Sequence, residues 1–478
     1  MMERIVKATS TTKLVLVGAV LAGAAFGAGA QTPAAAPKQT PPPGSAPKAF
    51  DVPAHETYTL PNGMRVTLVP YGNIPKVAVS LTVRAGNLNE PPDVRGVADI
   101  TGELLKEGTK SLSAQALAES AARMGSSLGV TVVPDESSVD VDVLSEYGGQ
   151  AVALVADVAM HPLLPESEVA RLKANLLRQV MVAKSRPGQI ALARFRKILY
   201  GDHPYGEILP TEESLKKMTI EDARKFYAGN YGAARAHLYV AGRFDVPAVK
   251  KAILSGFSDW AKGTEPVLDI PKPKTQRLLE LTDRPNAPQS TIYMGLPVAG
   301  PTSPDNVPLV VTNALLGGSF GSRITTNIRE QKGYTYSPTS QISRRYHDAY
   351  WAEIADVTTA STGPALKEIF GEIDKLQKEA PGATELKGVQ SYLSGLFVIQ
   401  NSTRQALIGQ LRYVDLQGLG DDYLKNFVQN VNAVSPEQVQ QMTAKYIKPE
   451  LMTIVVVGDK SKITEQLAPF ATAADSPK

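Results

Sequence analysis

The sequence predicts an α+β protein of two tandem homologous domains, each a mostly antiparallel sheet packed with helices. First, Thr219 opens a helical pattern that leads to an apolar strand ending at Gly242, and Ser435 opens a similar unit ending at Gly458. The two units lie 216 residues apart, a period that indicates duplicated domains rather than a solenoid. Second, helical and alternating apolar patterns are mixed along each half. Third, residues 264–274 form a Pro- and Lys-rich linker.

The elements of the first half follow from residue 58 onwards. Residues 58–69 contain two apolar runs around Asn62-Gly63, which predicts a strand, a tight turn and a second strand. Alternating residues predict further extended segments, and apolar spacing of three to four predicts helices. The extended ranges are 77–83 and 130–143, and the helical ranges are 96–107, 114–124, 151–185 and 188–199.

Both repeated units begin with a helix-start signal. Thr219 belongs to the residue types preferred at the N-cap. Ser435 is followed by proline, which is favoured at the first helical position. The strands predicted after these helices are 237–242 and 452–458. We therefore expect an N-terminal domain over 56–263, a C-terminal domain over 275–470 and a tail over 471–478.

Composition excludes several classes of function. The 478 residues include no cysteine, five histidines and a net charge of +3. Without cysteine the chain has no disulfides, no thiolate-bound zinc, no iron–sulfur cluster and no thiol catalysis. A hydrophobic content of 43% is typical of globular proteins, and the near-neutral charge gives no indication of nucleic-acid binding.

The N-terminus has the pattern of a bacterial secretory signal. Three basic residues precede an apolar run, which ends in Ala28-Gly29-Ala30. We expect residues 1–30 to be a signal peptide that directs the chain to the periplasm, with no stable membrane insertion after cleavage. Retention of the signal as an anchor is the alternative. Residues 31–55, rich in proline at their start, are predicted to be a linker.

Three segments together are similar to one known family. They are Gly96–Thr109, His203–Gly206 and Leu316–Ser337, the last containing Leu-Gly-Gly-Ser-Phe-Gly-Ser and Ile-Arg-Glu-Gln-Lys-Gly-Tyr-Thr-Tyr-Ser. With the duplication and the chain length, they resemble the pitrilysin/insulinase family of zinc peptidases, in its short two-domain bacterial members. The resemblance covers about residues 55–470 and implies the family's fold.

The resemblance also implies where a zinc site would lie. In active members the first segment carries H-x-x-E-H on a helix, with two zinc ligands and a general base, and a later glutamate completes the site. Aligned on the flanking residues, this chain has Asp99 and Glu103 in place of the histidines and Gly102 in place of the base. The third ligand falls near Gln179. We predict no metal here and no cofactor in this chain. A solvated helix face explains the two carboxylates better than a hard-metal site does, because two carboxylates are too few ligands for Ca²⁺.

The second half retains the other family feature. Active members supply an arginine and a tyrosine seven residues apart that face the zinc across the cavity, and Arg329 and Tyr336 match both type and spacing. Guanidinium and phenol groups can donate to the oxygen of a peptide carbonyl under attack. Arg329 and Tyr336 are therefore the predicted substrate-binding residues. Tyr334 is a competing candidate, expected on the same strand face as Tyr336.

The resemblance thus predicts a non-catalytic, substrate-binding subunit of a heterodimeric periplasmic zinc endopeptidase. The partner would be a family member with H-x-x-E-H and would hold the zinc, while this chain would be inactive alone. The alternative is a binding or scaffold protein with the same fold and no role in proteolysis. An enzyme active alone through other residues is the third hypothesis. No pair among the five histidines has the spacing of a helical metal motif, and His203 is expected to serve a turn.

Overall fold

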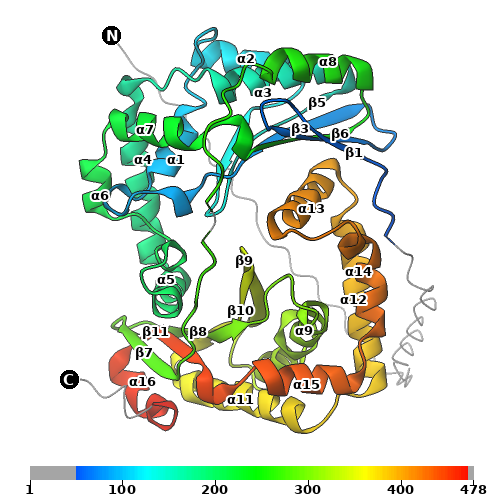
Figure 1. The fold of residues 1–478 in the computed structure, drawn as a ribbon. Coiled ribbons are helices and arrows are strands. Elements are labelled where there is room, and N and C mark those ends of the chain that lie inside the picture. Colours follow the sequence, from blue (N-terminus) through cyan, green and yellow to red (C-terminus); the bar gives the residue numbers. More distant parts are fainter. Residues whose placement is uncertain (1–49, 268, 472–478) are drawn as a thin grey trace, which may run out of the picture. The chain divides into compact units, whose positions relative to one another are not determined.

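The computed structural model describes residues 50–267 and 269–471, which lie within one compact unit that begins at Pro47. The expected signal peptide, the start of the linker and nearly all of the tail lie outside the described residues. The described part contains two sheets, each with helices packed on it (Figure 1).

The first sheet has the strand order β1-β2-β6-β3-β5-β4. Neighbouring strands are antiparallel except for β2 and β6, which run parallel. The strands are β1 (Glu56–Thr59), β2 (Arg65–Pro70), β3 (Lys76–Val83), β4 (Gly129–Val132), β5 (Ser137–Leu144) and β6 (Ala236–Gly242). The helices of this half are α1 (Val97–Leu104), α2 (Ala114–Arg123), α3 (Gly148–Met160), α4 (Glu166–Ser185), α5 (Pro187–Tyr200), α6 (Glu212–Lys217), α7 (Ile220–Asn230) and α8 (Val246–Phe257).

The second sheet has the order β7-β11-β8-β10-β9, with β7 and β11 parallel and the other pairs antiparallel. The strands are β7 (Leu278–Asp283), β8 (Gln289–Val298), β9 (Thr339–Arg345), β10 (Asp348–Thr358) and β11 (Thr453–Gly458). The helices are α9 (Asn306–Asn313), α10 (Arg323–Thr325), α11 (Thr362–Lys378), α12 (Ala383–Gln400), α13 (Arg404–Gln417), α14 (Asp422–Ala433), α15 (Pro436–Tyr446) and α16 (Lys460–Leu467).

The two halves are duplicates in topology and in register. Without β1, the first sheet has the order of the second. Leu238 of β6 pairs with Leu81 of β3, and Ile454, 216 residues after Leu238, pairs with Met294 of β8. The predicted α+β fold with two homologous parts is confirmed. The exact bounds of the two domains stay a prediction; residues 258–277, which include the expected linker, contain no helix or strand among those described.

The helix-start signals are confirmed as capping boxes. Thr219 Oγ1 accepts a hydrogen bond from the backbone N–H of Asp222, and the Asp222 carboxylate accepts one from the Thr219 N–H. Ser435 and Gln438 exchange the same pair of bonds at 3.2 and 2.9 Å. Each box satisfies amide groups that the first helical turn leaves without partners.

Two predicted elements were wrong in extent. The expected helix over 151–185 is split into α3 and α4, because Pro162 and Pro165 lie in the segment between them and proline cannot continue the hydrogen-bond ladder. The alternating run 130–143 is a hairpin of β4 and β5 rather than one strand, with its turn around Pro134.

Each half lends one helix to the sheet of the other. Helix α5 contacts β8 and β11 of the second sheet, and α13 contacts β3 and β6 of the first (Figure 1). The apolar cluster under α5 includes Phe195, Tyr293 and Tyr350, and the cluster under α13 includes Leu411 and Tyr239. This reciprocal exchange ties the halves together by burial of apolar surface.

Candidate functional site

Helix α1 carries the positions where the family's zinc motif would lie, and a distant carboxylate caps its start. Glu90 Oε1 accepts hydrogen bonds from the backbone N–H groups of Gly96 and Ala98, at 3.0 and 2.9 Å. These bonds serve donors at the positive end of the helix. Burial nevertheless raises the pKa of Glu90 to about 7, because desolvation outweighs the two backbone bonds.

The four positions aligned with the zinc site come together in the structure. Asp99, Gly102 and Glu103 of α1 and Gln179 of α4 line one cavity of about 140 Å³. Helices α1 and α4 pack against each other, which brings the amide of Gln179 towards the α1 carboxylates. The lining residues of this cavity all belong to the first half.

The donors in this cavity do not fit a zinc ion. Asp99 accepts a hydrogen bond from Asn87 Nδ2 at 2.9 Å, and Glu103 forms an ion pair with Lys106 at 2.8 Å. Burial raises the pKa of Asp99, and the nearby charge of Glu103 adds to the rise. Gln179 is a neutral amide, and no imidazole lines the cavity. Over residues 50–267 and 269–471, no group of three or more His, Cys, Asp or Glu is placed to hold a metal ion.

Gly102 also leaves no room for the missing base. A Cβ atom added there would lie 2.6 Å from Val132 Cγ2 and 3.5 Å from Val130 Cγ1. Both valines belong to β4, so the strand packs directly on the helix where a glutamate side chain would have to pass. The four aligned residues therefore line a small cavity that β4 crowds at Gly102 and that lacks the components for activating a metal-bound water.

Arg329 and Tyr336 lie side by side in the second half. Arg329 is in η7 (Thr326–Gln331), a turn of π-helix, and Tyr336 is in the segment that leads to β9. The guanidinium carbon of Arg329 lies 5.2 Å from the centroid of the Tyr336 ring. The side chain of Tyr336 is 80% exposed, so its hydroxyl is free to meet a ligand.

Tyr334 differs from Tyr336 in environment, which corrects one expectation. The two tyrosines do not share a strand face, because their segment makes only an isolated bridge between Thr335 and Val357. Tyr334 packs against the core of the second half, and its N–H donates to Ile328 O at 2.8 Å. Tyr334 therefore anchors the segment, and Tyr336 is the tyrosine available at the surface.

Sequence reasoning missed the third member of this surface group. The ring centroid of Phe320 lies 4.2 Å from the guanidinium carbon of Arg329, closer than the ring of Tyr336. Phe320 is 73% exposed. The signal available in the sequence was a phenylalanine among small turn residues, Gly-Gly-Ser-Phe-Gly-Ser.

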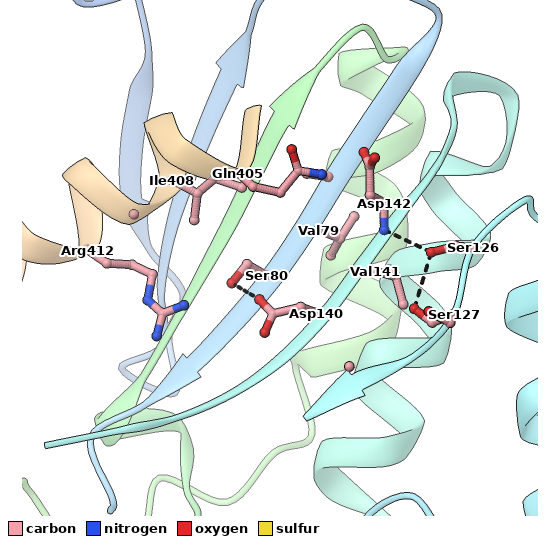
Figure 2. A pocket seen from close by; sticks show the side chains of 13 residues that line it. Val79, Ser80, Ser126, Ser127, Asp140, Val141, Asp142, Gln405, Ile408 and Arg412 are labelled. Atoms are coloured by element: carbon pink, nitrogen blue, oxygen red, sulfur yellow. Dashed lines mark hydrogen bonds between the residues drawn. The ribbon is translucent and has the colours of Figure 1, made fainter. Parts of the chain in front are cut away.

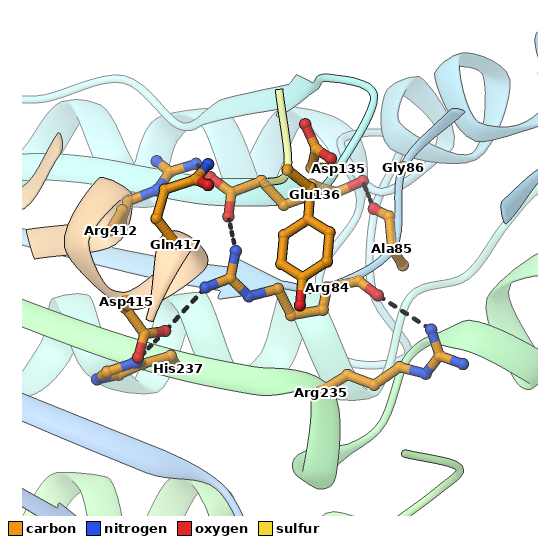
Figure 3. A network of polar contacts seen from close by, with 12 residues as sticks. Arg84, Ala85, Gly86, Asp135, Glu136, Arg235, His237, Arg412, Asp415 and Gln417 are labelled. Atoms are coloured by element: carbon orange, nitrogen blue, oxygen red, sulfur yellow. Dashed lines mark hydrogen bonds and ion pairs between the residues drawn. The ribbon is translucent and has the colours of Figure 1, made fainter. Parts of the chain in front are cut away.

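A charged network, also missed, joins α13 to the first sheet (Figure 3). Arg84 donates to Glu136 at 3.0 Å and to Asp415 of α13 at 2.9 Å, and Arg412 of α13 donates to Glu136 at 3.0 Å. Burial alone would raise the pKa of Asp415. Hydrogen bonding from His237 and the charges of nearby arginines instead hold it well below its usual range.

A cavity of about 380 Å³ lies beside this network, between α13 and strands β3 and β5 (Figure 2). Several of its polar groups already have partners. Ser80 donates to the Asp140 carboxylate, and the Asp142 N–H donates to Ser126 Oγ at 3.1 Å. The predicted site residues are not among those that line it. His203 is also structural, since its ring accepts from the Tyr205 N–H at 3.2 Å and starts a short 3-10 turn.

Comparison with known proteins agrees with this arrangement. A family model described as insulinase (peptidase family M16) matches residues 66–212, and one described as peptidase M16 inactive domain matches residues 217–393. The chain belongs to the insulinase family. Within that family it is a member whose first half lacks the H-x-x-E-H motif, with Asp99, Gly102 and Glu103 at the aligned positions.

Two relatives of this insulinase-family chain match it over nearly their whole length. An uncharacterized zinc protease YmxG of Bacillus subtilis is 26% identical, with 80% of this chain and 93% of the relative covered. The non-peptidase homolog YmxG of Helicobacter pylori is 22% identical, with 81% and 90% covered. A crystal structure of a peptidase M16 inactive domain from Pseudomonas fluorescens shares the fold, with a TM-score of 0.79, 23% identity and coverage of 85% and 98%.

The periplasmic protease PqqL from Escherichia coli shares the fold at a TM-score of 0.73 and 16% identity. The match covers 86% of this chain and 47% of PqqL. Among the residues that the structure describes, no helix is both long enough and apolar enough to cross a membrane.

Proposed function

We propose that this chain is the substrate-binding, non-catalytic subunit of a heterodimeric zinc endopeptidase. The observation that carries the proposal is the contrast between the two aligned sites. The zinc positions in the first half line a small cavity that has no imidazole and is crowded by β4 at Gly102, while Arg329 and Tyr336 in the second half are adjacent at the surface. The partner would be a family member with H-x-x-E-H, and it would hold the zinc.

The chemistry of the pair suits a peptide carbonyl. When a hydroxide attacks the carbonyl carbon, negative charge develops on the oxygen, and donors aimed at that oxygen lower the barrier. The Tyr336 hydroxyl donates one hydrogen bond, and the planar guanidinium of Arg329 can donate two in parallel. The Arg329 Nε lies 3.4 Å from Glu330 Oε1. The two terminal nitrogens of the guanidinium have no hydrogen-bond partner among the described residues.

Two comparisons support the role. The Helicobacter pylori relative is named a non-peptidase homolog, which fits a chain without the zinc motif. The match spans most of this chain but only 47% of the PqqL chain. One PqqL chain is therefore long enough for two units of this kind. A pair of separate chains would supply the same two units. The secretory signal expected over residues 1–30 supports a periplasmic location for the proposed complex, and the likeness to a periplasmic protease is consistent with it.

Co-expression with a candidate partner tests the proposal. The partner is a protein of similar length with H-x-x-E-H, encoded near this chain. We expect peptide hydrolysis by the pair, none by this chain alone, and no stoichiometric zinc on this chain alone by metal mass spectrometry. A pair that forms but cleaves nothing would favour the scaffold alternative. Zinc on this chain that is lost on mutation of Asp99 or Glu103 would contradict the assignment of the metal to the partner.

A further inference from the structure

The guanidinium of Arg329 lies close to two aromatic rings that are both exposed. Its central carbon is 4.2 Å from the Phe320 ring centroid and 5.2 Å from the Tyr336 ring centroid. The Arg329 side chain itself is only 22% exposed, and the two rings are among the groups beside it. Phe320 thus buries little of its own surface but shields a charged group that carries the proposed function.

The turn that presents Phe320 is anchored on both sides. Gly317 and Gly318 allow the chain to pass close to its neighbours, since a Cβ at Gly318 would lie 2.3 Å from Asn313 Nδ2. The Ser322 N–H donates to Ser319 O at 3.1 Å and closes the turn that contains Phe320. Ser322 is buried and caps the following helical segment through the Thr325 N–H. The backbone of Phe320 is therefore held, and its ring projects outward.

An ion pair fixes the segment that follows this turn. Arg323 donates to both carboxylate oxygens of Glu385 in α12, at 2.7 and 2.8 Å. Such a two-point contact restrains orientation as well as position. The next residues lead directly into η7, which carries Arg329.

The second ring reaches Arg329 through an independent anchor. Gly333 has a φ of +64°, a backbone conformation that glycine adopts without strain, and it reverses the chain after η7. Tyr334 then packs on the core, which leaves Tyr336 outside beside Arg329. Two separate turns therefore bring aromatic rings to the Arg329 guanidinium. One turn precedes Arg329 in the sequence and carries Phe320, and the other follows it and leads to Tyr336.

We propose that Phe320 is a positioning residue that holds the Arg329 guanidinium by stacking, so that its terminal N–H groups point outward in one plane. This inference rests on the proposed function of Arg329 and deepens it. A cation attracted to the ring face keeps a long, flexible side chain in one orientation. A guanidinium covered on its faces has its free donors at its edge, which suits a carbonyl oxygen of an extended peptide. Holding that geometry before the substrate arrives removes part of the cost of ordering the side chain on binding.

The first test needs only the isolated chain. The NMR signal of the Arg329 side-chain Nε–H is assigned as the one that disappears in the Arg329→Ala variant. The chemical shift of this proton is then compared in wild type, Phe320→Leu and Phe320→Trp. Stacking on a ring face shifts this proton upfield, so we expect Phe320→Leu to move it towards the value of a free arginine and Phe320→Trp to keep it upfield. An unchanged shift in Phe320→Leu would overturn the proposal, whatever the activity of the complex.

The second test uses the active pair of subunits. We expect Phe320→Leu to lower kcat/KM by about twofold to fivefold, the fold-change that corresponds to an exposed cation–π contact, and Phe320→Trp to restore it. In an Arg329→Ala background, Phe320→Leu should have no further effect, because Phe320 acts through Arg329. Tyr392→Leu is the matched control, since Tyr392 is an exposed aromatic on α12 and, among the described residues, is not one of the rings beside Arg329.

The outcomes separate this inference from the proposed function. If Arg329→Ala leaves the pair fully active, the substrate-binding role of Arg329 fails. If Arg329→Ala is damaging but Phe320→Leu equals wild type, the role of Arg329 stands and the positioning role of Phe320 fails. An equal loss from Phe320→Leu with and without Arg329 would show that Phe320 acts independently, which also contradicts the proposal.

Discussion

The two halves share one sheet topology, yet the residues at their site positions differ in burial. Those of the first half lie against a strand, and those of the second half lie at the surface. In the first half, the positions that correspond to zinc chemistry are absorbed into the fold, with β4 valines against Gly102. In the second half, two aromatic side chains that are each more than 70% exposed lie beside the guanidinium of Arg329. Exposed aromatic rings contribute little to folding, so stability does not explain their arrangement. This contrast supports the proposed substrate-binding role of the second half.

The largest expected effect tests that contrast directly. Tyr336→Phe removes one hydroxyl that donates to the developing oxyanion, so we expect kcat of the pair to fall by about 10²–10³ without loss of assembly. Tyr334→Phe is the matched control, because Tyr334 packs against the core instead of facing solvent. Steady-state kinetics with size-exclusion chromatography measures both. Equal losses from the two variants would mean that the exposed tyrosine has no special role.

A second comparison concerns the two exchanged helices. Helix α5 meets the second sheet through aromatic rings and one exposed ion pair, Arg194 with Glu280 at 3.4 Å, whereas α13 joins a more buried network of charges beside the first sheet. Asp415→Asn should destabilise the chain by about 1.5–3 kcal/mol at pH 7, since Arg84 loses a charged partner. The pKa of Asp415 is depressed in the folded state, so its contribution is present above the unfolded value near 4 and is lost as pH falls below it.

Urea denaturation at pH 7 and at pH 3 measures this difference. The gap between wild type and Asp415→Asn should narrow at the lower pH. Asp421→Asn is the control, because Asp421 is 43% exposed and its ion pair with His55 is partly open to solvent, where such contacts contribute little. Similar effects from the two variants would show that the network does not hold α13.

The sequence alone predicts many of the features that distinguish the two halves. Local patterns predict the repeat and the capping residues Thr219 and Ser435. Alignment with the family motif predicts that Asp99, Glu103 and Gln179 lie close together. The exchange of α5 and α13 did not follow, because amphipathic spacing shows that a helix has an apolar face but not which sheet covers it. Phe320 was missed for a related reason. A single phenylalanine in a turn predicts nothing until the fold places an arginine beside it.

A third comparison matches equivalent positions of the two sheets. Glu353 of β10 pairs with Met294, and the corresponding register in the first half pairs Val139 with Leu81. Glu353 is fully buried, and neither carboxyl oxygen has a hydrogen-bond partner among the described residues. Burial raises its pKa well above the usual value, so the folded chain keeps the neutral acid. Stability from this group is greatest below the unfolded pKa and falls as pH rises towards the folded one.

Glu353→Gln removes the titration while keeping the shape. Above pH 5, wild type should lose stability relative to this variant by about 1.4 kcal/mol for each pH unit up to the folded pKa. Denaturant midpoints at pH 5, 6, 7 and 8 measure the slope. Parallel curves for the two proteins would mean that the Glu353 carboxyl finds a partner in solution.

The smallest expected effect concerns Gly102, and it decides whether the remnant site is packed as tightly as the geometry indicates. Within a helix, alanine is favoured over glycine by about 0.5–1 kcal/mol, so Gly102→Ala gains that amount from propensity. The new Cβ would lie 2.6 Å from Val132, and overpacking of this kind costs about 1–3 kcal/mol. Gly388→Ala in α12 makes the same substitution where nothing lies within 4 Å of the new atom.

The difference between the two alanine variants isolates the packing cost, because both share the propensity gain. We expect Gly388→Ala to be more stable than wild type and Gly102→Ala to be less stable or equal, by urea denaturation. Val132→Ala should recover part of the loss in the Gly102→Ala background, since it removes the methyl group that the new atom meets. If Gly102→Ala stabilises the chain as much as Gly388→Ala does, β4 yields easily. A glutamate could then be placed at residue 102, and the first half would be a site that is chemically incomplete but still open.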